Sequence, residues 1–368
     1  MRQFAKIRRA GAATLLCGAM SLAGGCSDTT SAEGYGSAGA DADEARDTDE
    51  GSTGGADDGF PGQSSAEGGE STGFSDEPGP QTGGEVGSTG EETGGSLPPA
   101  DFGPYAECPE PLPAEWIFCE DFEEAYNPAA VFFDYADSDG NFVPTFDGGA
   151  SGIGAMQAHY REGVEGAGFM SVSFGANPIN INGRPGHASK ETFDEIYWRF
   201  RVKMQDGWPD AGPHNLTRIS AFAQSNWGQA MVASVSSKGD DVTLQASAAS
   251  CVQQGEVECA GIDDASSLEP LGTLVGDTPV FSAERGGQWQ CIEAHVRLNT
   301  PGEVDGAFEM WVDGKLEGSS EGVDWRGSWS EFGLNLLSIE NLWVGGAPAD
   351  LDRWFDDLVI STQPIGCD

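Results

Sequence analysis

The stretch Glu195 to Met204 alternates between apolar and polar side chains along its whole length. Successive side chains of a β-strand point to opposite faces of a sheet, so a period of two predicts a strand with one buried face. The sequence has no apolar stripe of helical period longer than about three turns. The residues expected on the inner face are Ile196, Trp198, Phe200, Val202 and Met204, with Tyr197, Arg199, Arg201 and Lys203 on the outer face.

Two later stretches, 289–298 and 307–312, repeat this alternation. Shorter strand signals lie at 117–123, 155–160, 168–174, 217–224, 229–236, 242–248, 341–346 and 354–362. Gly, Pro and Asp-Gly separate them at short intervals, as turns do. Many short strands with no helices between them predict an all-β fold, an antiparallel β-sandwich or jelly roll, for residues 104–368.

The first 26 residues read as a secretory signal. Basic residues at positions 2, 6, 8 and 9 precede a short apolar run that is too short to span a membrane as a helix. Cys26 follows Ala-Gly-Gly, and the segment resembles a bacterial lipobox with its leucine, Leu22, one place early. The resemblance implies a lipidated Cys26 and an exported protein of the outer membrane or cell surface, anchored by its acyl chains. Cleavage nearby by an ordinary signal peptidase is the alternative.

Residues 27–103 consist mainly of Gly, Ser, Thr, Asp and Glu. Such a composition cannot bury enough apolar surface to offset chain entropy, so a disordered acidic tether is expected. At coil dimensions it would reach roughly 50 Å, and charge repulsion would extend it.

The chain is strongly acidic, with 60 Asp and Glu against 18 Lys and Arg and a formal net charge of −42. This charge argues against nucleic acid or anionic lipid as a binding partner. It is typical of a solvated extracellular surface, and it supplies oxygen ligands for Ca²⁺. We expect a monomer.

Of the eight cysteines, one lies in the signal and Cys26 at the anchor, which leaves six for the domain. An even number in an exported domain predicts disulfides, although six cysteines allow fifteen pairings. Spacing along the chain favours Cys108–Cys119 and Cys251–Cys259, which leaves Cys291 to pair with Cys367.

Three motifs, in order, carry a resemblance to a known fold. They are FCEDFEE at 118–124, the hairpin from Trp289 to Gly314 with its Pro-Gly and Asp-Gly turns, and FDDLVIST at 355–362. This order resembles concanavalin A-like jelly rolls, and more narrowly the alginate and glucuronan lyases of that fold and their non-catalytic relatives. The resemblance covers most of residues 116–362.

Lyases of this kind cleave uronate polymers by β-elimination, which needs a neutralised carboxylate, a base and an acid. Arg suits the first task, and His or Tyr suits the others. If the strands at 195–204 and 289–298 share a sheet, they would bring these groups together. The candidate catalytic residues are Tyr197, His295 and Arg199, and the candidate substrate-binding residues are Arg201, Lys203, Arg218, Arg297 and Trp311.

Each candidate also has a structural interpretation. The cations, clustered between Arg184 and Arg218, could pair with acidic residues across strands. His295 could be a surface histidine with satisfied hydrogen bonds. Trp311 could be a platform for sugar rings or a tryptophan covered by a loop.

Jelly rolls of this type often hold one structural Ca²⁺ where the first and last strands meet. The resemblance therefore implies a calcium site that includes Asp357, Glu120 and Asp121, with Glu123 and Asp356 also in reach. By alternation only one of Asp356 and Asp357 would serve, and Asp357 is favoured.

No HExxH, GxSxG or catalytic-cysteine pattern occurs, and no carboxylate pair stands out as that of a glycoside hydrolase. The sequence therefore favours an exported lipoprotein that binds a polysaccharide, with a lyase acting on uronate-containing glycans as its enzymatic form. A non-catalytic carbohydrate-binding or adhesion module is the alternative, and a purely structural envelope protein is the third possibility.

Overall fold

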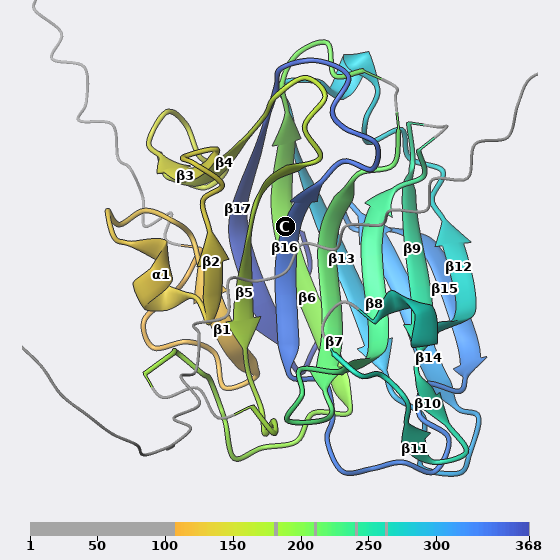
Figure 1. Cartoon of the computed structure of the whole chain (residues 1–368). Helices are drawn as coiled ribbons and strands as arrows, with labels where there is room; N and C mark the ends of the chain where they lie inside the picture. The colour runs from red at the N-terminus through yellow and green to blue at the C-terminus, as the bar shows by residue number, and fades with distance from the viewer. Residues whose placement is uncertain (1–106, 180–182, 210–211, 240–241, 262–263, 368) are drawn as a thin grey trace, which may run out of the picture. The chain divides into compact units, whose positions relative to one another are not determined.

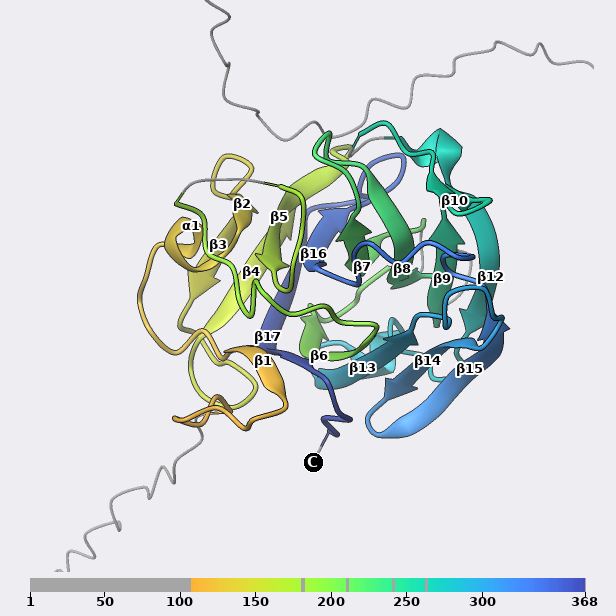
Figure 2. The same cartoon turned by 90° about the horizontal axis from the view of Figure 1, so that it is seen from below.

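The computed structural model describes residues 107–179, 183–209, 212–239, 242–261 and 264–367. The signal, the tether and Cys26 lie outside the described residues. Within them, the chain is an antiparallel β-sandwich of two large sheets, seen edge-on in Figure 2. The expected fold class is confirmed.

The first sheet has eight strands in the order β15-β14-β13-β6-β17-β4-β3, with β1 paired to β17. Its strands are β1 (Trp116–Glu120), β3 (Phe142–Thr145), β4 (Ala155–Tyr160), β6 (Glu195–Met204), β13 (Trp289–Arg297), β14 (Gly306–Val312), β15 (Lys315–Val323) and β17 (Leu351–Ser361).

The second sheet has seven strands in the order β12-β9-β8-β7-β16-β5-β2 (Figure 1). Its strands are β2 (Asp134–Ala136), β5 (Gly166–Ser173), β7 (Asn215–Phe222), β8 (Gln229–Ser237), β9 (Leu244–Ser250), β12 (Glu269–Val275) and β16 (Leu336–Leu342). A small hairpin joins β10 (Val252–Gln253) to β11 (Glu256–Val257), and the short helices are α1 (Pro128–Val131), η1 (Ala265–Ser267) and η2 (Ala283–Arg285).

The core between the sheets is built from the alternating positions that the sequence indicated. Trp198, Phe200 and Val202 of β6 are fully buried, and so is Ile292 of β13. Each Val, Leu, Ile or Phe side chain buried in this way contributes about 1.5–3 kcal/mol. The alternation therefore fixes which face of each strand is turned to the core, and with it which residues are left on the outer faces.

One expected strand was misplaced. The signal at 341–346 predicted a strand there, whereas β16 runs from Leu336 to Leu342. Leu337 and Ile339 face the core, but Leu336 packs outside it against Phe133 and Phe222. Because β16 is covered on both faces, it lacks the alternation by which its position could be predicted.

The hairpin turn at Asp313-Gly314 is confirmed. Val312 pairs with Lys315, and both turn residues have positive φ, 48° for Asp313 and 76° for Gly314. Two left-handed residues in a two-residue loop match the twist of the flanking strands, and Asp-Gly adopts that turn readily. The turn sets the register of the pairs next to it, up to the irregularity between Met310 and Trp311.

The three expected disulfides are present: Cys108–Cys119, Cys251–Cys259 and Cys291–Cys367. The third joins β13 to the tail that follows β17, which runs below the eight-stranded sheet in Figure 2. No helix among the described residues has the length and hydropathy of a membrane span.

Candidate functional site

The outer face of the eight-stranded sheet carries the predicted row of β6. β13 lies next to β6, and their register pairs Tyr197 with His295 and Arg199 with Glu293. The expectation that these two strands share a sheet is therefore confirmed. The sheet brings a phenol, an imidazole and a guanidinium onto neighbouring positions of one face.

His295 lies on this face but is buried, with 3 % of its surface exposed. Its Nε2 lies 2.9 Å from Glu195 and its Nδ1 lies 3.0 Å from Glu309. Its ring stacks on that of Tyr197. Both ring nitrogens thus face carboxylate oxygens, which is the arrangement of a histidine with satisfied hydrogen bonds.

Arg199 is covered by the two ends of the domain. Its guanidinium donates to the carboxylate of Glu107 and to the carbonyl of Gly366, 3.1 Å away. On the neighbouring strand, the Glu293 carboxylate accepts hydrogen bonds from the amides of Ile365 and Gly366, each at 2.9 Å. We call residues 362–367 the terminal strap. The strap leaves only 3 % of Arg199 exposed.

Arg201 and Lys203 are the next outward cations of β6. The Nε of Arg201 lies 2.9 Å from Oδ2 of Asp357. The Nζ of Lys203 lies over two indole rings, 4.6 Å from the centroid of Trp289 and 4.9 Å from that of Trp354. Burial lowers the pKa of Lys203.

The remaining predicted cations do not join this group. Arg218 lies on β7 in the other sheet, 2.5 Å from the carboxylate of Glu340. Arg297 stands on the outer face beside His295 but pairs with Glu321 at 3.1 Å. Arg218 therefore lies on the opposite side of the sandwich from the other predicted site residues.

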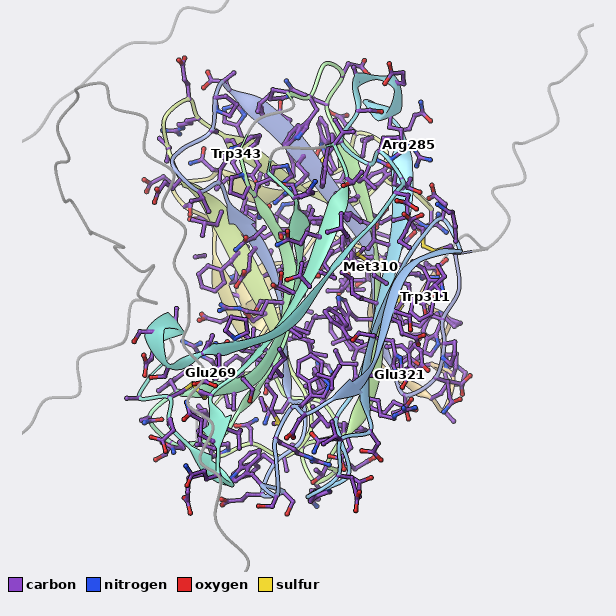
Figure 3. The ribbon with its side chains drawn as sticks, turned by 90° about the vertical axis from the view of Figure 1, so that its right-hand side faces the viewer. Glu269, Arg285, Met310, Trp311, Glu321 and Trp343 are labelled. Carbon is purple, nitrogen blue, oxygen red and sulfur yellow. A yellow bond between two sulfur atoms is a disulfide. The ribbon has the colours of Figure 1, made fainter. Side chains whose placement is uncertain are left out.

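Four aromatic side chains lie half-buried on the outer face. Trp311 is half-buried and, as Figure 3 shows, lies outside the sheet, whereas its neighbour Met310 lies between the two sheets. Tyr197, Trp289 and Trp354 are also half-buried on this face. Trp289 and Trp354 were not among the predicted site residues, although alternation along β13 and β17 places both opposite the core.

The acidic residues expected to bind calcium lie at the junction of β1, β17 and the loop before β4. Asp356 and Asp357 are completely buried. Burial and the neighbouring Asp357 raise the pKa of Asp356 to about 8. Oδ1 of Asp357 accepts a hydrogen bond from Ser151, while Oδ2 lies near Arg201 but has no aligned donor.

The carboxylates of the other two expected ligands accept hydrogen bonds from backbone amides. Glu120 accepts a hydrogen bond from the amide of Phe122, and Asp121 accepts one from that of Cys108. In the described part of the chain, no three carboxylate, imidazole or thiol side chains converge on one point. Of the three expected ligands, Asp357 is the one that is completely buried.

No protein-family model matches the sequence, and no curated protein is similar to it. Solved structures similar to this chain include endo-β-1,4-glucuronan lyase from the fungus Trichoderma reesei, with a TM-score of 0.46, 11% identity and coverage of 67% of this chain and 96% of that one. Alginate lyase vAL-1 from Chlorella virus has a TM-score of 0.39 and 15% identity, and the match covers 60% of this chain and 89% of that one.

The cellulose induced protein Cip1 is a further similar structure, with a TM-score of 0.39 and 17% identity over 68% of this chain and 100% of that one. These proteins are of the kinds that the sequence motifs resemble. With TM-scores below 0.5 and identities of 11–17%, these likenesses indicate neither an activity nor a substrate for this chain.

Proposed function

We propose that the domain binds a polysaccharide, without cleaving it, on the outer face of the eight-stranded sheet. The observation that carries this proposal is the set of half-buried aromatic side chains Tyr197, Trp289, Trp311 and Trp354 on that one face. Indole and phenol rings present flat apolar surfaces to sugar rings and keep a polar edge for hydroxyl groups. A sheet face holds such rings in fixed positions, which limits the entropy lost on binding.

The hydrogen bonds of the face favour binding over catalysis. A lyase that works by β-elimination needs one group that can take a proton and another that can neutralise the substrate carboxylate. Both nitrogens of His295 already face carboxylates, and Arg199 is held by Glu107 and the terminal strap. Glycan binding by the aromatic rings requires neither residue to be free.

The rest of the sequence supports a role at the cell surface. We propose that Cys26 is lipidated and that the acidic segment 27–103 holds the domain away from the membrane. A glycan bound by the domain would then be kept close to the cell envelope. A calcium ion at Asp357 would be structural, neutralising buried carboxylates near the junction of β1 and β17.

Glycan retention by aromatic variants tests the proposal. Affinity electrophoresis of the full chain in gels containing alginate, glucuronan or a neutral β-glucan should show retardation by at least one polymer. Trp311→Ala should lose most of that retardation, since stacking on an aromatic ring is worth about 0.5–1.5 kcal/mol beyond area burial. Trp329→Ala is the matched control, because Trp329 is also half-buried but packs on Phe332 in the loop after β15. Equal mobility of the wild type with and without every polymer would overturn the proposal.

A lyase is the second candidate, favoured by the stacked pair of Tyr197 and His295 beside Arg199. Incubation of the full chain with alginate or glucuronan, followed by absorbance of unsaturated products, measures it directly. Product formation that disappears in Tyr197→Phe would establish catalysis and overturn the non-catalytic proposal.

A further inference from the structure

Trp289, Lys203 and Trp354 form a continuous row across three adjacent strands of the eight-stranded sheet. The register pairs Lys203 of β6 with Trp289 of β13 on one side and with Trp354 of β17 on the other. All three side chains point outward, because their neighbours Val202 and Phe355 are fully buried in the core. We call these three residues the Trp-Lys-Trp row.

We propose that the Trp-Lys-Trp row is the subsite that selects acidic sugars, with the Lys203 ammonium binding a sugar carboxylate and the two indoles contacting the rings on either side. The inference rests on the proposed polysaccharide-binding function and names the class of glycan, one that contains uronic acid or another anionic sugar. In this proposal the negative charge of the glycan is bound by Lys203, and not by Arg199 or Arg201 of the same strand.

The spacing of the row suits an extended sugar chain. Neighbouring strands lie about 4.8 Å apart, so the strand positions of Trp289 and Trp354 are separated by roughly 10 Å across the sheet. That separation exceeds the width of a single aromatic ring, so the two indoles would contact different parts of a bound chain. Lys203 lies between them, within 5 Å of both ring centroids.

The charge balance of the row points to an anion. Arg199 pairs with Glu107 and Arg201 with Asp357, but no carboxylate of the described residues forms an ion pair with Lys203. Among the described residues, its ammonium donates one hydrogen bond, to the carbonyl of Gly148 at 3.3 Å. An ammonium has three donors, so hydrogen-bonding capacity remains for a ligand. A carboxylate held between the indoles would be partly shielded from water, which strengthens the interaction.

Polar groups continue the row in the direction of β4. Gln157 pairs with Trp354 across the sheet, and Asp352 lies two residues from Trp354 on the same face. Asp352 accepts a hydrogen bond from Gln157 at 3.0 Å and lies 2.9 Å from Nδ1 of His159. These side chains offer donors and acceptors to sugar hydroxyls beside the aromatic platform.

Non-specific charge attraction would not produce the proposed preference for acidic glycans. The chain carries a net charge of −42, so its overall field repels a polyanion. Preference for an acidic polymer over its neutral counterpart therefore requires a local cation, and binding to that cation should weaken as salt is added.

Isothermal titration of the full chain tests the row with two probes: uronate oligosaccharides prepared from alginate or glucuronan, and neutral β-glucan oligosaccharides of the same length. The wild type should bind a uronate probe more tightly. Lys203→Met keeps the length of the side chain and should weaken uronate binding about ten- to a hundredfold while leaving the neutral probe unchanged. Lys203→Arg should retain most of the preference. The matched control is Lys315→Met, on an exposed lysine that pairs with Glu317 on β15.

A melting curve for each variant separates binding from folding. If Lys203 only packs between the two tryptophans, Lys203→Met will lower the melting temperature and leave the preference for uronate intact, which would overturn the inference. Equal wild-type affinity for the uronate and neutral probes would also overturn it while leaving polysaccharide binding standing. Binding to neither probe, and to none of the polymers in the gels, would remove the proposed function and this inference with it.

Discussion

The rings of Tyr197 and His295 lie face to face on neighbouring strands, with centroids 4.0 Å apart and planes inclined by 9°. His295 also lies between Glu195 of β6 and Glu309 of β14, within 3.0 Å of each. His295 therefore links three strands through its side chain, and we interpret it as a structural residue of the outer face.

Replacement of His295 should reduce stability and spare glycan binding. His295→Ala removes the ring that lies within hydrogen-bonding distance of both Glu195 and Glu309, so we expect the free energy of unfolding to fall by about 1–3 kcal/mol. Urea unfolding measures the loss, and affinity electrophoresis measures the binding. A variant that folds with unchanged stability but no longer binds or cleaves glycan would instead assign His295 to the functional site.

The disulfide between Cys291 and Cys367 should hold the terminal strap over Arg199. The double variant Cys291→Ser/Cys367→Ser removes a link between residues 76 positions apart, and such links are typically worth about 2–4 kcal/mol. We expect a lower melting temperature and faster amide exchange at Ile365 and Gly366, whose amides donate to Glu293. Cys251→Ser/Cys259→Ser is the control, because its loop lies on the other sheet. Unchanged exchange at the strap would show that the hydrogen bonds alone hold it.

Alternation predicted the buried face of β6, β13 and β14, because each has one face in the core and the other turned outward. It failed at β16, which is covered on both faces, and at β15, an edge strand whose sequence KLEGSSEGV has few apolar residues. The sequences of such strands lack the alternation of apolar and polar residues from which a strand can be predicted.

Site residues were predictable as members of an outward row, but their partners were not. Glu107 lies 92 residues from Arg199, and Gly366 lies 167 residues from it. Nothing local in the sequence indicates these contacts. The position of Lys203 between Trp289 and Trp354 likewise depends on the register of β6 with both neighbours, which alternation alone leaves open.

Calcium removal tests the acidic junction. If a Ca²⁺ neutralises Asp356 and Asp357, dialysis against EDTA should lower the melting temperature, and added Ca²⁺ should restore it in proportion to the logarithm of its concentration. Asp357→Asn should abolish the response, while Asp313→Asn, at an exposed turn, should keep it. Identical melting curves with EDTA and with millimolar Ca²⁺ would argue against a calcium ion in the junction.

Stability should also fall in acid because of a buried histidine. His214 is 2 % exposed, and its Nδ1 lies 3.2 Å from the guanidinium of Arg353, which is itself completely buried. Burial, with the Arg353 charge, lowers the pKa of His214 well below its usual value of 6.5. Below pH 6.5 the unfolded chain therefore binds a proton at this site that the folded chain does not.

Because of this difference in bound protons, the free energy of unfolding falls as the pH falls. The contribution of neutral His214 is fully present above pH 6.5 and is lost as the pH falls towards the folded-state pKa, at up to about 1.4 kcal/mol per pH unit. We expect urea unfolding between pH 7.5 and pH 5 to show this decline. His214→Gln, if it folds, should flatten the slope even though it lowers stability throughout. An equal slope in wild type and His214→Gln would assign the acid sensitivity to other groups.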